Sequence, residues 1–212
     1  MPSIADIRQD YKLQSLNETD AHSPLELFGK WWQEAVAAEI QEVNAMTLAT
    51  ASVDAVPSAR IVLLKGYNEK GFVFFSNYNS FKGRQLEENP RATLVFFWKE
   101  LERQVRITGL VSKTSEQESD EYYSSRPEGS KLGAWASPQS QVIESRNWLE
   151  TIESDFRKKF AEQPIPRPPH WGGYRVKPVN FEFWQGRPSR LHDRLQFVLL
   201  AEGIWQLERL AP

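Results

Sequence analysis

Closely spaced apolar segments in the first half of the chain constrain its fold more than any other feature. Residues 45–52, 58–67 and 72–77 are rich in aliphatic and aromatic side chains, and short polar turns separate them. Apolar runs of this length, bounded by turn residues, are typical of β-strands. The pattern therefore predicts a meander of antiparallel hairpins.

Further strands follow, and helices are inserted between them. We expect additional strands at residues 91–98, 103–114, 174–186, 195–203 and 204–212. Capping residues and amphipathic spacing predict helices at residues 23–43, 80–89, 115–126 and 145–160. Prolines make residues 162–173 a linker without regular structure. Because the helices do not alternate with the strands, we expect a mainly β (α+β) fold, a β-barrel with helical additions.

The length and charge of the chain limit its organisation and partners. We expect residues 1–22, which are polar and lack periodicity, to form an N-terminal arm or lid, and residues 23–212 to form a single domain. A net charge of −2 argues against general binding to nucleic acid or a membrane surface. No segment has the length and apolarity of a signal peptide or spanning helix, so a cytoplasmic location is expected. The chain has no cysteine, and we expect no metal site.

Positive charge is concentrated near the end of the chain, in RPSRLHDRLQF at residues 187–197. If residues 190–194 are extended, Arg190, His192 and Arg194 share one face of the strand. Like charges this close repel each other unless an anion lies among them, so the stretch indicates an anion-binding pocket. A solvated edge strand, with its charge balanced by Asp193 and water, explains the same residues about equally well.

A second pair of cations brackets four aliphatic residues in RIVLLK. On one continuous strand Arg60 and Lys65 point to opposite faces and lie roughly 16 Å apart, at about 3.3 Å per residue. Two separate anions or one long ligand would suit that spacing. The alternative is a buried strand with a charged side chain reaching solvent at each end.

Two more groups carry the donors that a phosphate accepts. Ser76 and Lys82 surround the expected start of a helix, where backbone N–H groups and the helix dipole favour an anion. Tyr122, Arg126 and Ser130 combine a phenol, a guanidinium and a hydroxyl within one short segment. The first group is weak as a motif, and ordinary helix-end capping explains the second group about as well.

Ordered motifs over nearly the whole chain resemble the pyridoxine (pyridoxamine) 5′-phosphate oxidase family. They are RIVLLK, LERQVRITG, YYSSRPEGSKLGAWASPQS, WGGYRV and FWQGRPSRLHDRLQF, with ERLAP at the end. The resemblance implies a homodimeric, FMN-binding split β-barrel with the flavin at the subunit interface. It also implies that pyridoxine 5′-phosphate and pyridoxamine 5′-phosphate are oxidised to pyridoxal 5′-phosphate, in vitamin B6 biosynthesis or salvage, with O₂ as electron acceptor and H₂O₂ as product.

The resemblance also implies the residues of the site. Expected FMN contacts are Arg60, Ile61, Val62, Leu63, Leu64, Lys65, Phe75, Ser76, Lys82, Gln104, Gln139, Ser140, Trp184 and Arg194. Expected substrate contacts are Arg8, Tyr11, Lys65, Tyr122, Arg126, Ser130, Arg190, Leu191 and His192. Arg190 and His192 are the expected catalytic residues, with Arg190 stabilising developing charge and His192 orienting the substrate ring. A general-base role for His192 stays open, because its unperturbed pKa lies near neutrality.

One residue departs from the family's pattern, and two other function classes remain to be weighed. Phe81 stands where the family usually has an arginine, so either another group compensates for this missing FMN-phosphate contact or FMN binds more weakly. The first alternative function is a split-barrel module that binds flavin or pyridoxal phosphate without turnover, which the Arg190 and His192 pair disfavours. The second is an oxidoreductase that uses a deazaflavin, for which the cluster around Arg126 would be superfluous.

Overall fold

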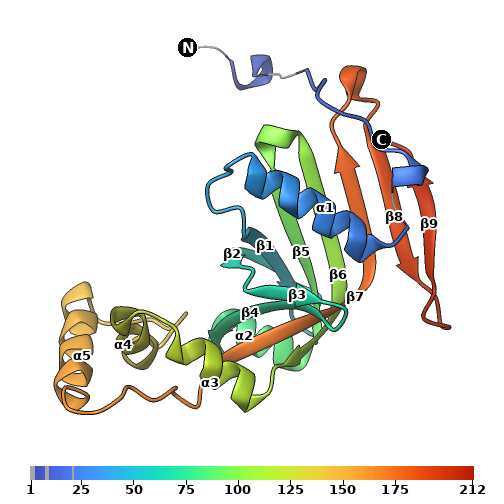
Figure 1. The fold of residues 1–212 in the computed structure, drawn as a ribbon. Coiled ribbons are helices and arrows are strands. Elements are labelled where there is room, and N and C mark those ends of the chain that lie inside the picture. Colours follow the sequence, from blue (N-terminus) through green and yellow to red (C-terminus); the bar gives the residue numbers. More distant parts are fainter. Residues whose placement is uncertain (1–2, 8–9, 21) are drawn as a thin grey trace.

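The computed structural model describes residues 3–7, 10–20 and 22–212, and its strands form one antiparallel sheet (Figure 1). The nine strands are β1 (Ala45–Ala51), β2 (Pro57–Leu63), β3 (Gly66–Asn68), β4 (Gly71–Asn77), β5 (Arg91–Trp98), β6 (Arg103–Lys113), β7 (Trp171–Gln185), β8 (Asp193–Leu199) and β9 (Trp205–Leu210). Their order is β2-β1-β5-β6-β7-β4-β3, and β8 and β9 continue from β7. The expected antiparallel, mainly β fold is confirmed, but the expected continuous meander is wrong. The strand predicted at residues 58–67 is divided into β2, which pairs with β1, and β3, which pairs with β4 at the other end of the strand order.

β7 is the longest strand, with 15 residues, and it joins two parts of the sheet. Its first half pairs with β4 and its second half pairs with β8, while β6 runs along its other edge. The pairing of β6 with β7 shifts register between Thr108 and Gly109, where β7 has one extra residue. A Cβ at Gly109 would lie 2.3 Å from the carbonyl oxygen of Lys177, so only glycine allows this close pairing.

The sheet curls without closing into a complete barrel. β2 and β4 approach each other, although β2 and β3 occupy the two ends of the strand order and no ladder joins them. An apolar core fills the concave side, and its largest buried side chains are Trp98, Phe28, Phe72, Phe74, Phe96, Phe181, Phe183 and Phe197. Phe28 contributes from a helix, and its ring lies 4.9 Å from Phe72 and 5.3 Å from Phe96. This partly open form is a split β-barrel.

The described residues form five α-helices: α1 (Pro24–Ala37), α2 (Phe81–Glu88), α3 (Glu116–Ser124), α4 (Glu128–Ala136) and α5 (Arg146–Lys159). α4 and α5 pack on each other to one side of the sheet (Figure 1). α1 begins at the predicted Ser23 cap but ends at Ala37 rather than Val43, because Glu39 adopts a positive φ of 52°. α4 was not predicted; its N-cap is Pro127, which offers no side-chain hydrogen bond. The predicted linker is wrong at its end, since Trp171 and the two following glycines begin β7.

Residues 10–20 of the N-terminal arm lie along the sheet near β8 and β9, whereas the short turn Ile4–Asp6 stands away from the sheet (Figure 1). The backbone N–H groups of Lys12 and Leu13 donate to the carboxylate of Glu102. Leu16 is buried in the core, and its carbonyl oxygen accepts a hydrogen bond from Arg209. Among the described residues, no helix is long and apolar enough to span a membrane.

Candidate active site

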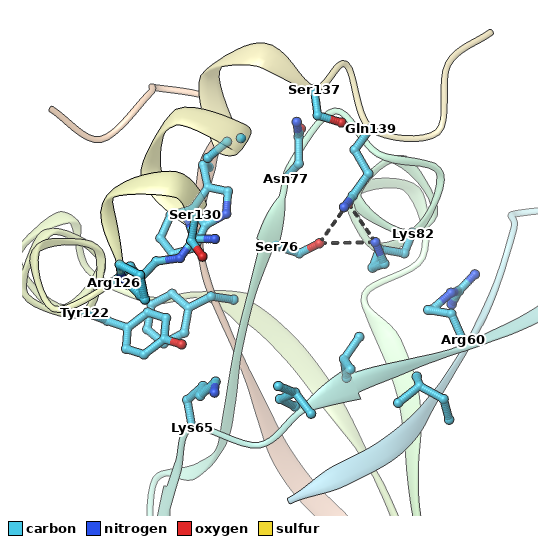
Figure 2. Close-up of a pocket in the computed structure, with 18 of the residues that line it drawn as sticks. Arg60, Lys65, Ser76, Asn77, Lys82, Tyr122, Arg126, Ser130, Ser137 and Gln139 are labelled. Atoms are coloured by element: carbon cyan, nitrogen blue, oxygen red, sulfur yellow. Dashed lines mark hydrogen bonds between the residues drawn. The ribbon is translucent and has the colours of Figure 1, made fainter. Parts of the chain in front are cut away.

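A cavity of about 980 Å³ lies between the curled strands and the helices α2, α3 and α4 (Figure 2). β2 and the residues after it supply Arg60 to Leu63 and Lys65, and β4 supplies Phe75, Ser76 and Asn77. The helical side supplies Lys82, Tyr122, Ser125, Arg126, Pro127, Ser130, Gly133, Ala134, Ser137, Gln139 and Ser140, and Trp171 completes the wall. No cluster that could hold a metal ion occurs in the described part of the chain.

One end of the cavity is formed by Arg60 and Lys82 (Figure 2). The Lys82 ammonium donates to Gln139 Oε1 at 2.9 Å and to Ser76 Oγ at 3.2 Å. The short helix α2 holds this lysine in place, because Ser80 caps the helix by accepting a hydrogen bond from the Gly83 N–H. Burial, together with the nearby charge of Arg60, lowers the pKa of Lys82 to about 8. Two close cations in a half-buried position favour an anion between them.

The other end of the cavity is formed by Arg126, with Tyr122, Ser130 and Lys65 around it (Figure 2). The Arg126 guanidinium stacks over the ring of Trp171, 4.6 Å from its centroid. Its Nη1 atom is buried and has no hydrogen-bond partner among the described residues. Burial lowers the pKa of Arg126, but an arginine stays charged. A buried charged donor without a partner is costly, so this end too is suited to an anion.

Aromatic rings form the wall between the two cationic ends. Phe75 stacks on Tyr122 with ring centroids 4.0 Å apart, and on Trp171 at 5.5 Å. Glycines make this packing possible, because a Cβ at Gly173 would lie 2.9 Å from the Phe75 ring. The cavity thus combines a flat apolar surface with a cationic group at each end.

Arg60 and Lys65 line the same cavity, so the prediction that they face opposite sides was wrong. β2 ends at Leu63, and the alternation of side chains does not continue through the turn to Lys65. Of the two interpretations of this pair, one long ligand fits the arrangement better than two separate anions. Leu64, between them, is 5% exposed and belongs to the core.

A second group of predicted residues lies at the other end of β7. Gln104, Trp184 and Arg194 are direct neighbours across β6, β7 and β8, so they form one row on the outer face of the sheet. Phe97 continues this row on β5 and is 57% exposed. Trp171 lines the cavity and Trp184 lies in this row, about 40 Å further along the same strand at roughly 3.3 Å per residue.

Tyr11 and His192 pack beside this row. The His192 ring lies 4.6 Å from Trp184, and Tyr11 contacts both rings. His192 Nδ1 accepts a hydrogen bond of 3.1 Å from the Arg187 backbone N–H, so a neutral imidazole here carries its proton on Nε2. Burial and the adjacent charge of Arg190 lower the pKa of His192. The neutral ring therefore presents Nε2–H outward as a donor.

The segment around His192 is not extended as predicted. Residues Pro188–Arg190 form a short 3-10 turn, and Ser189 and Arg190 have positive φ values of 57° and 61°. The strand begins only at Asp193, so Arg190, His192 and Arg194 do not share a strand face. Arg194 is already engaged, since it donates to Glu182 at 3.0 Å and to the carbonyl oxygen of Ala211 at 2.7 Å.

The predicted site residues therefore fall into two separate places in one chain. Most of those from β2, β4 and the helices meet in the cavity, whereas Tyr11, Gln104, Trp184, Arg190, Leu191, His192 and Arg194 lie away from it. Arg190 and Leu191 are exposed, and Arg8 lies outside the described residues. Sequence reasoning missed Asn77, Ser125, Ser137 and Trp171 as lining residues; for Trp171, its position beside two glycines was the available signal.

The fold and the cavity define a split β-barrel protein whose cavity has a flat aromatic wall between two cationic ends. Solved structures agree with this class. PhzG from Burkholderia lata, in complex with tetrahydrophenazine-1-carboxylic acid, superposes with a TM-score of 0.88 at 29% identity, over 96% of this chain and 100% of that one. A pyridoxamine 5′-phosphate oxidase-related, FMN binding protein from Nostoc punctiforme has the same fold, with a TM-score of 0.71 at 15% identity, over 91% and 99%.

Sequence comparisons give the family. The profile described as pyridoxamine 5′-phosphate oxidase matches residues 32–154, and that of the pyridoxine 5′-phosphate oxidase C-terminal dimerisation region matches residues 171–212. Proteins named pyridoxine/pyridoxamine 5′-phosphate oxidase are similar over their full length: that of Cupriavidus metallidurans is 57% identical, with all of both chains covered, and that of Bordetella pertussis is 58% identical, over 99% of this chain and 100% of that one. The chain belongs to the pyridoxamine 5′-phosphate oxidase family.

Proposed function

We propose that this protein oxidises pyridoxine 5′-phosphate and pyridoxamine 5′-phosphate to pyridoxal 5′-phosphate, with FMN as cofactor and O₂ as electron acceptor. The alcohol gives the aldehyde and H₂O₂, and the amine, with one water, gives the aldehyde, ammonia and H₂O₂. The observation that carries the proposal is one cavity that has a cationic group at each end and an aromatic wall between them. Two phosphorylated, planar ligands lying side by side would satisfy both ends.

FMN fits the residues at the Arg60 end. Arg60 and Lys82 would bind its phosphate, and Ser76 would contribute a hydroxyl to the same group. These cations lie close enough to affect each other's charge, so a phosphate there would relieve their repulsion. When bound, the flavin supplies the two-electron acceptor that the protein's own side chains lack.

The substrate phosphate fits the Arg126 end. The unpartnered Nη1 of Arg126 supplies a buried donor, and Ser130, Tyr122 and Lys65 supply a hydroxyl, a phenol and an ammonium. Binding energy at the phosphate would hold the reacting carbon of the substrate in place for oxidation. The surrounding aromatic wall would exclude water from the planar rings.

The site is completed by a second copy of the chain in this proposal. About 40 Å of β7 separates the cavity from the group around His192, which is too far for one chain to place both on one ligand. The match of residues 171–212 to a dimerisation region supports a homodimer. The exposed Phe97, in the row with Trp184, gives that face apolar surface for a partner to cover.

In the dimer, Arg190 and His192 of one protomer would lie over the substrate in the cavity of its partner. The Nε2–H of His192 would donate a hydrogen bond to a substituent of the pyridine ring. Because Nδ1 already accepts from the backbone, this geometry supports an orienting role for His192 over that of a general base. Arg190 would stabilise negative charge that develops on the substrate.

The experiment is a spectrum and a turnover assay on the purified protein. We expect bound flavin absorbance, and consumption of O₂ with formation of H₂O₂ and an aldehyde when either phosphorylated vitamer is added. A protein that holds flavin but turns over neither vitamer would instead be the binding module without catalysis. A protein without affinity for FMN would contradict the proposal as a whole.

A further inference from the structure

We infer that Gln85, which does not line the cavity, is a positioning residue that prepares Arg60 to bind the phosphate of the flavin. The inference rests on the proposed function, because it assigns Arg60 to the FMN phosphate. Gln85 lies on α2 and is 3% exposed. It reaches Arg60 only through two hydroxyl groups, those of Thr50 on β1 and Ser58 on β2.

The hydrogen bonds in this network have a defined direction. Thr50 Oγ1 and Ser58 Oγ both donate to Gln85 Oε1, each at 2.6 Å. A hydroxyl has one proton, so both oxygens then offer only lone pairs to other neighbours. Arg60 uses them, since Nη1 donates to Thr50 at 2.6 Å and Nη2 donates to Ser58 at 2.9 Å. A hydroxyl can either donate or accept a hydrogen bond, and Gln85 fixes both of these hydroxyls as acceptors for Arg60.

The same contacts decide which edge of the guanidinium is left for a ligand. Arginine has five N–H donors in a fixed plane. Nη1 donates both of its protons, one to Thr50 Oγ1 and one to the Leu48 carbonyl oxygen. Nη2 donates one of its two protons to Ser58 Oγ. The donors that find no partner in the described part of the chain are Nε–H and one on Nη2. Thr50 and Ser58 are direct partners across β1 and β2, so the donors they receive are the two on the terminal edge of the guanidinium. The Nε–H and the remaining Nη2–H then lie together on the side edge, which is the fork that binds a phosphate through two parallel hydrogen bonds.

The other atom of the Gln85 amide shows that packing does not account for this residue. Nε2 is buried and has no hydrogen-bond partner among the described residues. A buried donor without a partner is unfavourable, and an apolar side chain of similar length would avoid this cost. The contribution of Gln85 therefore lies in its oxygen, which faces the network to Arg60.

The test compares FMN with riboflavin, which has the same ring system and no phosphate. In the full-length protein freed of flavin, we expect Gln85→Met to bind FMN about tenfold more weakly, because Thr50 and Ser58 would no longer be held as acceptors for the charged Arg60. Riboflavin affinity should stay at the wild-type value, because Arg60 is assigned to the phosphate alone. Equal loss for both flavins, or no loss for FMN, would overturn the inference.

Two further variants separate positioning from simple damage to the helix. Leu86→Ala removes a buried side chain from the same helix without touching the network, so it should lower the Tm and leave the ratio of FMN to riboflavin affinity unchanged. Ser58→Ala removes one hydroxyl and should reproduce the FMN-specific loss even if Gln85→Met folds poorly.

A double-mutant cycle then tests the route through Arg60. If Gln85 acts through this arginine, Gln85→Met should have no further effect on FMN affinity in an Arg60→Lys background, because lysine lacks the fork. Additive losses would mean that Gln85 acts in another way. If the wild-type protein bound neither flavin, the proposed function would fail first, and this inference would fall with it.

Discussion

At the scale of single residues, the cavity is lined by several arginines and lysines and, in the part of the chain that the structure describes, by no aspartate or glutamate that would balance their charge. Arg126 illustrates this most clearly, because its buried Nη1 has no partner within the described residues and its guanidinium packs on the rings of Trp171 and Tyr123. A buried donor without a partner destabilises the folded protein until a ligand supplies the missing acceptor. Ligand binding at Arg126 should therefore remove this cost.

Replacing this arginine gives a first prediction. Arg126→Ala should raise the KM for either phosphorylated vitamer by about a hundredfold, the scale of one bidentate charged contact, with little change in flavin content. Steady-state kinetics and the flavin-to-protein absorbance ratio measure the two effects. Arg146→Ala, on the exposed side of α5, is the matched control and should change neither. Parallel loss of flavin would show that Arg126 does not serve the substrate alone.

Lys82 gives a prediction for pH. Its pKa of about 8 means that the ammonium is charged at neutral pH and loses its proton within the alkaline range where most lysines stay charged. FMN affinity should therefore fall as the pH rises through about 8, by roughly tenfold over the transition. Fluorescence titration of the apoprotein from neutral to alkaline pH measures this. In Lys82→Met the same range should be flat, and an equal decline there would assign the effect to another group.

Residue chemistry was the part of the site that the sequence predicted best. The arginines, lysines and hydroxyls near Arg60, Lys82 and Arg126 could be selected because a phosphate needs such donors. The sequence could not predict which way these side chains point. Because β2 ends at Leu63, the turn after it brings Lys65 to the same cavity as Arg60. Gln85 was missed for the same reason, since its role depends on hydroxyls from two other strands.

At the scale of elements, α2 places Lys82 in the cavity and packs closely, through Gly83, against the backbone of Tyr78. Ser80, Lys82 and Gly83 occupy its first turn, and a Cβ at Gly83 would lie 2.0 Å from the carbonyl oxygen of Tyr78. That oxygen belongs to the backbone and cannot rotate away. Glycine is thus required for the helix to lie close enough to place Lys82 in the cavity.

This contact predicts the effect of a single methyl group. Gly83→Ala should destabilise the protein by about 1–3 kcal/mol, as overpacking does, and should also weaken FMN binding because α2 moves outward with Lys82. Thermal unfolding and flavin titration measure the two changes. Gly129→Ala is the control, because a Cβ there meets nothing within 4 Å. Full FMN affinity in Gly83→Ala would show that α2 can shift without moving the lysine.

Local signals decided which elements could be predicted. β1, β4, β5, β6 and α2 carry strong patterns or a side-chain cap, and they appear close to where they were expected. The strand expected at residues 58–67 is instead broken after Leu63. α4 was missed because it begins after Pro127 without a side-chain cap, directly beside the predicted end of α3. The stretch before β8 was wrongly extended because the positive φ values at Ser189 and Arg190 leave no trace in residue type.

At the scale of the whole molecule, the proposed site needs one half from each of two chains. This arrangement predicts complementation between two inactive variants. Arg126→Ala damages the cavity and Arg190→Ala damages the group that would cover the partner's cavity, so each homodimer should have little activity. When both chains are co-expressed, each mixed dimer contains one intact site out of two, so the purified mixed dimers should have about half of wild-type activity.

The outcome is measured on dimers purified through two different tags, to separate them from the parental forms. A mixture of the two separately purified variants, tested before any subunit exchange, is the control and should stay inactive. If the mixed dimers were no more active than either parent, both residues would belong to sites that do not cross the interface.

The continuity of β7 has a last consequence for how this architecture tolerates change. One strand carries Trp171 at the cavity and Trp184 at the opposite end. The number of residues between them therefore sets the distance between the cavity and the group around His192. Inserting one residue would turn every later side chain to the other side of the sheet. Insertions and deletions in natural sequences of this kind should therefore collect in the turns, while the length of this strand stays fixed.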